Sequence, residues 1–566
     1  MPTFKEYAYT RPNMDEIKAN ISALLEKFDT AETVEQQSEV ITAINKVYNT
    51  YSTMMNIVYI RASIDTTDEF YQAELDYFNE VGPHLEETVS NYYKHLVASK
   101  FRPQLEEKWG NQLFALADNT IKGFAPEVIE LKQKENRLVT EYNKLIASAQ
   151  IEFDGKTLTL AQLAPYGQST DREVRKASKE ASSAFFAANA EKFDDLYDQL
   201  VKVRHEIATT LGYKNYVELG YVNMNRIDYN AEMVANFRKQ VRDSIVPVAS
   251  KLYKRQAKRI GLEGDFKFYD GGLNFLSGNA NPQGSPEWIV ENGKKMYEEL
   301  SPETGEFFNY MIDNELMDLV AKTGKQSGGY CTFIEDYNSP FIFSNFNGTA
   351  GDIDVLTHEA GHAFQVYRSR DIGIPEYLWP TFESCEIHSM SMEFFTWPWM
   401  ELFFKEQTDK YKFTHLSGGL LFIPYGVTVD EFQHIVYENP EMTPAERKAA
   451  WKELEATYLP DRDYGEDEYL QSGAFWQRQG HIFASPFYYI DYTLAQICAF
   501  QFWKRSRENF EDAWKDYVHL CGLGGSLSFT KLVAEAGLIS PFEDGCVESV
   551  IGTIEEYLNS INDEAL

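Results

Sequence analysis

Cysteine is scarce in this chain of 566 residues. Only five are present, which is an odd number, and no two of them have C-x-x-C spacing. A few unlinked thiols are typical of a reducing compartment, because disulfide-rich frameworks belong to oxidising ones. The first residues also lack the apolar core of a signal sequence, and no stretch approaches the roughly 18 apolar residues of a membrane span. These absences predict a cytoplasmic protein that is not attached to a membrane.

Basic residues are outnumbered by acidic ones. The chain has 53 Lys and Arg against 87 Asp and Glu, which gives a formal net charge of −34. It contains no Lys/Arg run and no alternation of aromatic and basic residues. Because nucleic-acid binding relies on cationic contacts to phosphates, this balance excludes a nucleic-acid partner. A hydrophobic content of 43% excludes global disorder, and the length predicts two or more lobes.

Helical periodicity dominates the chain. Apolar residues recur at intervals of three and four with charged faces between them, which predicts amphipathic helices. Residues 151–160 are an exception, because Asp154-Gly155 separates two alternating runs and predicts a β-hairpin. Residues 264–286 are rich in Gly, Asn and Pro and predict a loop. The sequence therefore predicts a mainly α fold, with helices over 13–27, 31–65, 68–96, 126–147 and 171–211.

The most informative motif is His358-Glu359-Ala360-Gly361-His362, an H-E-x-x-H pattern in a stretch with helical character. On a helix, positions i and i+4 lie on one face, so both imidazoles reach a single Zn²⁺ at roughly 2.0–2.1 Å. Glu359 emerges beside the first histidine, where a carboxylate takes a proton from an attacking water. The motif predicts metal-dependent hydrolysis, with His358 and His362 as zinc ligands and Glu359 as the general base.

Two surface histidines one helical turn apart would give the same sequence pattern. The neighbouring residues argue against that alternative. Leu356, Ala360, Ala363 and Phe364 make the segment apolar on most sides, which is typical of a buried helix. Gly361 costs about 1 kcal/mol relative to Ala inside a helix, so we expect it to serve close packing or an open site.

A catalytic zinc site needs a third protein ligand and leaves its fourth position open. Residues 382–393 predict a second helix whose glutamates share one face and compete for this role: Glu383, Glu386 and Glu393. Cys385 and His388 are further chemical possibilities. Spacing alone leaves the choice open, because a glutamate-bearing helix about twenty residues after the second histidine admits Glu383 as readily as Glu386.

Together these segments resemble the M3 family of zinc oligopeptidases, in its oligoendopeptidase F branch. The resemblance rests on residues 358–364 and 385–393, and it extends over about residues 325 to 540 through Gly328–Cys331, Pro340–Phe346, Gly348-Thr349, His481–Tyr492 and Gly524–Ser526. In that family the third ligand opens an E-x-x-S-x-x-x-E pattern, which here begins at Glu386. The resemblance therefore implies that Glu386 is the third zinc ligand and that Glu393 orients a ligand imidazole.

The same resemblance implies the architecture of the molecule. It implies a gluzincin-like fold with two helical lobes around a deep substrate channel and a small β-sheet element near the zinc helix. We expect the amino-terminal helical lobe over residues 1–190 and the zinc-bearing catalytic lobe over residues 191–566. Such a channel admits short, unstructured peptides and excludes folded proteins.

Phe341-Ile342-Phe343 is a short, β-prone apolar run that ends at a polar turn. Because it lies just upstream of the zinc helix, we expect an edge strand on which an extended peptide pairs through main-chain hydrogen bonds. Phe343 and Asn345 are therefore candidate substrate-binding residues. The alternative is a buried core strand, since a short apolar run fits both.

The segment from His481 to Tyr492 offers further hydrogen-bond donors. Peptide hydrolysis passes through an oxyanion, which His and Tyr side chains stabilise as its charge develops. His481, Tyr489 and Tyr492 resemble positions that bind substrate and transition state in the family, although Ser485-Pro486 stands where the better-known members have Gly-Tyr. This departure leaves the relative roles of the tyrosines open. We predict that His481 and Tyr492 stabilise the oxyanion and that Tyr488 and Tyr489 bind substrate.

The predicted function is that of a zinc-dependent oligoendopeptidase, with one Zn²⁺ per chain, that hydrolyses internal bonds of short unstructured peptides. Two alternatives remain. A zinc carboxypeptidase of a related helical fold would need a group that fixes the substrate's terminal carboxylate, and no motif designates such an Arg. A non-catalytic peptide-binding protein would use a structural zinc ion, which usually has four protein ligands. The sequence carries no signal for cleavage preference or oligomeric state.

Overall fold

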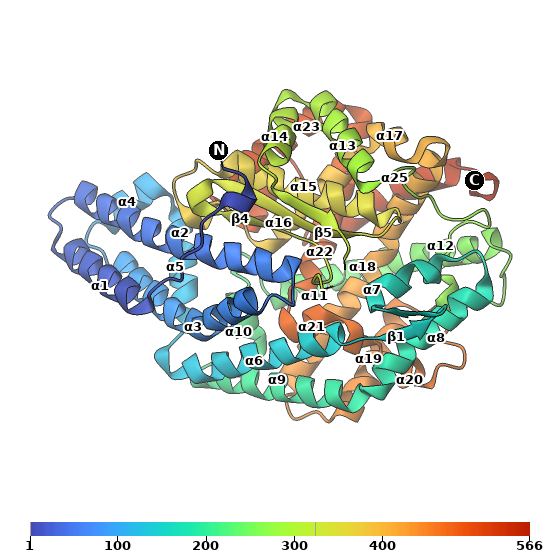
Figure 1. Cartoon of the computed structure of the whole chain (residues 1–566), viewed down its shortest axis with the longest axis horizontal. Helices are drawn as coiled ribbons and strands as arrows, with labels where there is room; N and C mark the ends of the chain where they lie inside the picture. The colour runs from blue at the N-terminus through green and yellow to red at the C-terminus, as the bar shows by residue number, and fades with distance from the viewer. Residues whose placement is uncertain (1, 323) are drawn as a thin grey trace.

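The structure is a computed structural model that describes residues 2–322 and 324–566. Helices dominate it, and the strands form only two small sheets, which confirms the predicted mainly α fold. Figure 1 shows helices α1 to α5 gathered at one end of the molecule. The helices of the amino-terminal part are α1 (Met14–Thr30), α2 (Val34–Ile64), α3 (Glu69–Val97), α4 (Arg102–Trp109), α5 (Asn111–Lys122), α6 (Ile129–Ala147), α7 (Leu160–Leu163), α8 (Arg172–Ala188) and α9 (Ala190–Thr210).

A further set of helices surrounds the middle of the molecule in Figure 1. It comprises α10 (Tyr216–Asn223), α11 (Ala231–Gln240), α12 (Val246–Arg259), α13 (Pro286–Leu300), α14 (Pro302–Asp313), α15 (Gly351–Ser369), α16 (Phe382–Phe395), α17 (Glu401–Phe404), α18 (Thr408–Glu438), α19 (Pro444–Tyr458), α20 (Glu468–Gln471), α21 (Gly480–Ala484), α22 (Tyr489–Glu508), α23 (Phe510–Leu523), α24 (Phe529–Glu535) and α25 (Cys546–Ser560). None of the helices in the described ranges combines the length and apolar character that crossing a membrane requires.

The predicted hairpin is present. Strands β1 (Ile151–Phe153) and β2 (Lys156–Leu158) pair antiparallel. Asp154 and Gly155 both adopt positive φ, at 51° and 68°, and form the two-residue turn between the strands. This is the geometry that an Asp-Gly pair favours in a type I′ turn.

The second sheet lies beside α15 and corrects one prediction. It contains β3 (Met317–Val320), β4 (Tyr330–Ile334) and β5 (Ser339–Phe346) in the order β3-β5-β4. Because β5 pairs with β3 on one side and with β4 on the other, it is the central strand, and the prediction that it forms an edge was wrong. The uninterrupted apolar run of β5 is typical of a strand buried on both faces. The edge strands are β3 and β4.

Helices α15 and α16 pack against each other at Gly361. A Cβ at this position would lie 2.6 Å from Cα of Ser389 and 2.7 Å from the carbonyl oxygen of His388. Real Cβ atoms do not approach backbone atoms so closely, so only glycine fits between the two helices. Of the two roles expected for Gly361, close packing is the one that the structure supports.

The amino-terminal helices have a core of their own that is continuous with the rest of the molecule. Buried residues of α1 to α5 form one cluster, and Ile374 and Tyr377, which follow α15, complete it. The Tyr377 hydroxyl donates to the Trp109 carbonyl and accepts from the Leu113 amide, both at 2.8 Å. The segment after α15 therefore ties α4 and α5 to the rest of the molecule.

Candidate active site

Helix α15 presents the H-E-x-x-H residues on one face. The rings of His358 and His362 lie one turn apart, with centroids 5.0 Å from each other. Asp352 starts the helix by accepting hydrogen bonds from the amides of Asn347 and Gly348, each at 2.8 Å. A negative side chain in the first turn of a helix is also favourable for its dipole. The motif thus lies on a helix whose start is fixed.

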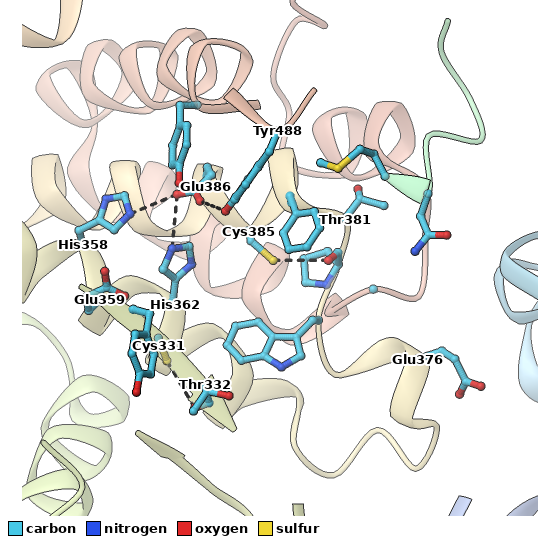
Figure 2. Close-up of a pocket in the computed structure, with 18 of the residues that line it drawn as sticks. Cys331, Thr332, His358, Glu359, His362, Glu376, Thr381, Cys385, Glu386 and Tyr488 are labelled. Atoms are coloured by element: carbon cyan, nitrogen blue, oxygen red, sulfur yellow. Dashed lines mark hydrogen bonds and ion pairs between the residues drawn. The ribbon is translucent and has the colours of Figure 1, made fainter. Parts of the chain in front are cut away.

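Glu386 of α16 meets both histidines. Its Oε2 lies 3.2 Å from Nε2 of His358 and 3.4 Å from Nε2 of His362. The three ligand atoms lie within 4.8 Å of one another, and among the described residues these three form the one such group of His, Cys, Asp and Glu. Figure 2 shows both rings pointing toward Glu386. Two imidazole nitrogens and one carboxylate oxygen are the donor set of many catalytic zinc sites, so the residues fit this metal.

The two histidines favour the ionised form of Glu386. Burial opposes ionisation of Glu386, but His362 and His358 outweigh it and hold the pKa of this carboxyl well below its usual range. The competing Glu383 points elsewhere. Its carboxylate is fully buried, interacts electrostatically with Arg226 and lies outside the group formed by the two histidines and Glu386. Within the structure, Glu386 and not Glu383 converges with the histidines.

Glu359 lies on the wall of the same cavity with a buried, unpaired carboxylate oxygen, Oε2. Burial raises the pKa of this carboxyl, and the neighbouring His358 and His362 oppose that rise. Gly329 faces it from the start of β4, where a Cβ would lie 3.3 Å from Glu359 Oε1 and 3.1 Å from the Val355 side chain. A buried acceptor without a partner is suited to take a proton from a water beside the histidines.

Glu393 connects His358 to a residue that the sequence did not designate. Its Oε1 lies 2.7 Å from Nδ1 of His358, and its Oε2 lies 2.7 Å from Nε2 of His415 on α18. The indole Nε1 of Trp397 donates to Nδ1 of His415 at 3.1 Å. The predicted orienting contact of Glu393 is thus present in the structure. His415 and Trp397 belong to no sequence motif that would designate them, so their hydrogen bonds are found only in the folded structure.

The segment around α21 and α22 supplies donors opposite α15. His481 Nε2 lies 3.3 Å from the Tyr492 hydroxyl, and Gln479 Nε2 lies 2.8 Å from His481 Nδ1. Burial lowers the pKa of His481 to about 4, so its imidazole is neutral near pH 7. Because an amide nitrogen only donates, Gln479 leaves the imidazole proton on Nε2, toward the Tyr492 hydroxyl.

The tyrosines of this segment have different surroundings. The Tyr488 hydroxyl donates to Oε1 of Glu386 at 2.6 Å, and its ring stacks on that of Tyr492 with centroids 5.1 Å apart. Both residues line the cavity. Tyr489 instead packs edge-on against Phe422 and Tyr425 and is not part of the cavity wall. We therefore withdraw Tyr489 as a substrate contact, because α22 turns its side chain toward α18.

Two further predicted substrate contacts lie away from the cavity. The Phe343 ring is fully buried and stacks on Tyr330. The Asn345 side chain donates to the carbonyl oxygens of Gln326 and Gly328, each at 2.8 Å. Asn345 therefore shapes the loop before β4. Neither residue lines the cavity, because their strand is central rather than peripheral.

The cavity has a volume of about 670 Å³ and joins parts of the chain that are distant in sequence. His358, His362 and Glu386 are surrounded by residues from α5, the end of α10, β4, the turn before α16 and the α21–α22 segment. Of the cavity-lining residues that the structure describes, none is Lys or Arg. The lining includes residues that sequence reasoning missed for want of a local signal: Gln112, Leu116, Met224, Asn225, Glu376 and Trp379.

Two family models match most of the chain. Residues 4–124 match the family model described as the peptidase M3 N-terminal domain, and residues 166–279 and 294–550 match that of peptidase family M3. The chain belongs to peptidase family M3. It is an M3 metallopeptidase of the oligoendopeptidase F type, as the sequence motifs predicted.

Three individual relatives of this M3 peptidase support the family assignment. A solved structure of Pz peptidase A with an inhibitor is 62% identical with a TM-score of 0.98, over 99% of this chain and 100% of the other. A structure from Bacillus anthracis str. Ames, described provisionally as an oligoendopeptidase F, is 57% identical with a TM-score of 0.94 over the whole of both chains. An oligoendopeptidase F homolog from Borreliella burgdorferi is 26% identical over 70% of this chain and 69% of its own.

Proposed function

We propose that this M3 peptidase is a zinc-dependent oligoendopeptidase that hydrolyses internal bonds of short, unstructured peptides. The observation that carries the proposal is the convergence of His358, His362 and Glu386 on the wall of a cavity that also holds the unpaired carboxylate of Glu359. These three residues would hold one Zn²⁺ per chain. When bound, the ion supplies Lewis acidity that polarises the scissile carbonyl and lowers the pKa of a water molecule.

Glu359 is the proton carrier in this proposal. It accepts a proton from the attacking water and passes it to the leaving amine. Its buried, unpaired oxygen supports this role, because a carboxylate with no competing donor keeps its acceptor free. Gly329 keeps the space beside it clear of any side chain.

His481 and Tyr492 serve the developing oxyanion. Both line the cavity, and the neutral imidazole directs its Nε2 proton to the same side as the phenol. Donors held in place before the reaction stabilise charge that appears in the transition state. Tyr488 has a separate task, because its hydroxyl already donates to Glu386 and fixes that carboxylate.

The outer edge of β4 at Cys331 is the surface on which we propose that the peptide backbone lies. The Phe333 carbonyl faces away from β5 and accepts a hydrogen bond from Asn56 at 2.8 Å. Backbone groups two residues apart in an antiparallel strand face the same side, so those of Cys331 also face away from β5. Cys331 lines the cavity beside Gly329. An extended peptide can therefore pair with β4 next to Glu359.

The lining of the cavity argues for internal cleavage. A carboxypeptidase needs a cation to fix the terminal carboxylate, whereas the described lining residues include Glu359, Glu376 and Glu386 but no Lys or Arg. A relative of 62% identity was solved as a peptidase with an inhibitor, which supports a peptide-like occupant. We further propose that residues 1–190 and 191–566 act as the two lobes on either side of the substrate, since α5 contributes Gln112 and Leu116 to the wall.

A cleavage assay tests the proposal. The purified protein is incubated with unstructured peptides of graded length and with one folded protein, and the products are identified by mass spectrometry. The Glu359→Gln variant is the blank, since it should keep its zinc and lose turnover. Internal cuts in the peptides with the folded protein intact are expected. Stepwise removal of terminal residues would indicate an exopeptidase, and an active Glu359→Gln variant would overturn the role of Glu359.

A further inference from the structure

The turn between α21 and α22 contains a strained residue. Phe487 has φ +67°, in the left-handed region that aromatic side chains rarely adopt. Such a conformation persists only where the surrounding structure enforces it. Phe487 directly precedes Tyr488, and its turn reverses the chain between His481 on α21 and Tyr492 on α22. The backbone at Phe487 therefore sets the direction of the tyrosines that face the metal ligands.

Arg226 holds the carbonyl side of this turn. Its Nη2 donates to the Phe487 carbonyl oxygen at 2.5 Å and to Oδ1 of Asp491 at 2.7 Å. Arg226 and Asp491 are both buried, and Asp491 stands next to Tyr492 on α22. The guanidinium thus links the turn to the first turn of the helix that follows it.

Two other residues hold Phe487 from different directions. Gln433 of α18 is fully buried, and its Oε1 accepts the Phe487 amide hydrogen at 2.9 Å. Gly220 of α10 lies under the aromatic ring, where a Cβ would be 2.5 Å from Cδ2 of Phe487. The amide, the carbonyl and the ring of Phe487 are therefore each held by a separate residue from a distant part of the chain.

We infer that Arg226, Gln433 and Gly220 form a positioning clamp, which keeps Phe487 in its left-handed conformation and thereby keeps Tyr488 against Glu386 and Tyr492 beside His481. None of the three residues lines the cavity, and they act through the turn and, at Arg226, through Asp491 at the start of α22. The inference rests on the proposed function, in which Tyr492 and His481 meet the oxyanion and Tyr488 fixes Glu386. Reacting groups displaced by about 1 Å lose on the order of a hundredfold in rate, so such a clamp has catalytic value.

Gly220→Ala is the sharpest probe, because it adds one methyl group beneath the Phe487 ring and removes no charge. Gly552→Ala is its matched control, since Gly552 also lies inside a helix, α25, and has no atom within 4 Å of an added Cβ. With a fluorogenic peptide, Gly220→Ala is expected to lower kcat by about tenfold or more. KM should stay within about twofold, because uniform binding is retained. Bound zinc should stay at one per chain, and Gly552→Ala should match the wild type.

A second pair of variants guards against simple misfolding. Combining Gly220→Ala with Phe487→Gly removes the clashing ring and introduces a residue that adopts positive φ freely, so part of the lost kcat should return. Arg226→Lys should lower kcat, because it keeps the positive charge but loses the planar guanidinium that bonds to both Phe487 and Asp491. Arg447→Lys is its control, because Arg447 is buried, pairs with Asp198 at 3.0 Å and leaves Nε and Nη1 unpaired, as Arg226 does.

The position of Tyr488 can also be read without activity or metal. In zinc-free protein that carries 3-fluorotyrosine at position 488, the fluorine NMR resonance should shift with Gly220→Ala and stay unchanged with Gly552→Ala. An unchanged resonance, or a shifted one with full kcat, would overturn the clamp. A loss of folded protein with normal kcat per folded molecule would also overturn it. An active Glu359→Gln variant would instead overturn the proposed function, and the fluorine signal would still test the clamp.

Discussion

Trp397 donates its indole hydrogen to Nδ1 of His415 at 3.1 Å, and this contact fixes the direction of a chain of hydrogen bonds that ends at the metal ligands. An indole only donates, so Nδ1 of His415 is an acceptor and its proton lies on Nε2. That proton goes to Glu393, whose other oxygen accepts from Nδ1 of His358. The Nε2 lone pair of His358 is then free for a metal.

Trp397→Phe should therefore weaken zinc binding. A smaller aromatic ring remains and the indole N–H donor is lost, so His415 no longer has a fixed tautomer. We expect an affinity loss of about tenfold, the lower end of what outer hydrogen bonds to metal ligands contribute. Competition with a chromogenic chelator measures it. Trp399→Phe is the control, since Trp399 donates to Glu299 at 2.8 Å on an exposed surface, and an equal loss there would refute the chain.

Glu386→Gln should lower the bound zinc content, whereas Glu383→Gln should leave it unchanged. Only Glu386 converges with the histidines. Burial raises the pKa of Glu383 to about 7 despite the opposing charge of Arg226, so an uncharged amide is a close substitute. Metal analysis of both purified variants decides between them. Zinc loss in Glu383→Gln alone would transfer the ligand role to that residue.

A peptide acid and its C-terminal amide should be cleaved with equal kcat/KM. No Lys or Arg is among the described residues that line the cavity, so a terminal carboxylate has no cationic partner there. An enzyme that buries such a pair would lose about 2–5 kcal/mol of interaction with the amide. Parallel kinetics on one octapeptide in both forms provide the measurement. A preference for the acid of more than about thirtyfold would favour the carboxypeptidase alternative.

His481→Gln should lower kcat without moving the acid-side midpoint of the pH–rate profile. Because burial lowers the pKa of His481 to about 4, the ring is already neutral and does not titrate between pH 5 and 8. Its contribution as a neutral donor is constant over that range. A pH series of kcat/KM for wild type and variant tests this. A midpoint that shifts when His481 is replaced would show that His481 itself titrates there.

Glu335→Gln should stabilise the protein at alkaline pH. Burial raises the pKa of Glu335 from 4.5 to about 8, so the carboxyl is protonated in the fold at pH 5 and must ionise unfavourably above pH 8. For a raised pKa, the stability is full below the unfolded value and is lost as pH rises through the folded one. Because about 3.5 units separate the two pKa values and each unit is worth about 1.4 kcal/mol, the stability of the variant relative to wild type should rise by up to about 4 kcal/mol from pH 5 to pH 9. Thermal denaturation at both values, with exposed Asp336→Asn as control, provides the check.

The local part of the site was predictable from sequence because it follows helical spacing. His358, Glu359 and His362 lie within two turns of one helix, and the apolar neighbours of the motif predict that this helix is buried. The Asp154-Gly155 turn was equally local. The choice between Glu383 and Glu386 was not, since both share a face of α16. It depended on family resemblance at first, and in the structure on the contacts of Glu386 Oε2 with both histidine rings.

The failed predictions concern long-range pairing. The apolar run at Phe343 does form a strand, but its neighbours on both sides come from β3 and β4, and no local pattern states this order. Tyr489 was misplaced because one residue along a helix changes the side chain's direction by about 100°. His415 and Trp397 were missed because the contact of His415 with Glu393, and that of Trp397 with His415, join residues that no local sequence pattern links.

The order of the site's parts along the chain has a consequence during synthesis. The ribosome releases α15 and α16, with all three ligands, well before it releases His481, Tyr488 and Tyr492 on the segment that the clamp orients. Helix α16, which carries Glu386, packs mainly against α22, so a chain interrupted between these segments would lack both this packing and the groups that we assign to the oxyanion. The proposed hydrolytic site is therefore complete only late in translation.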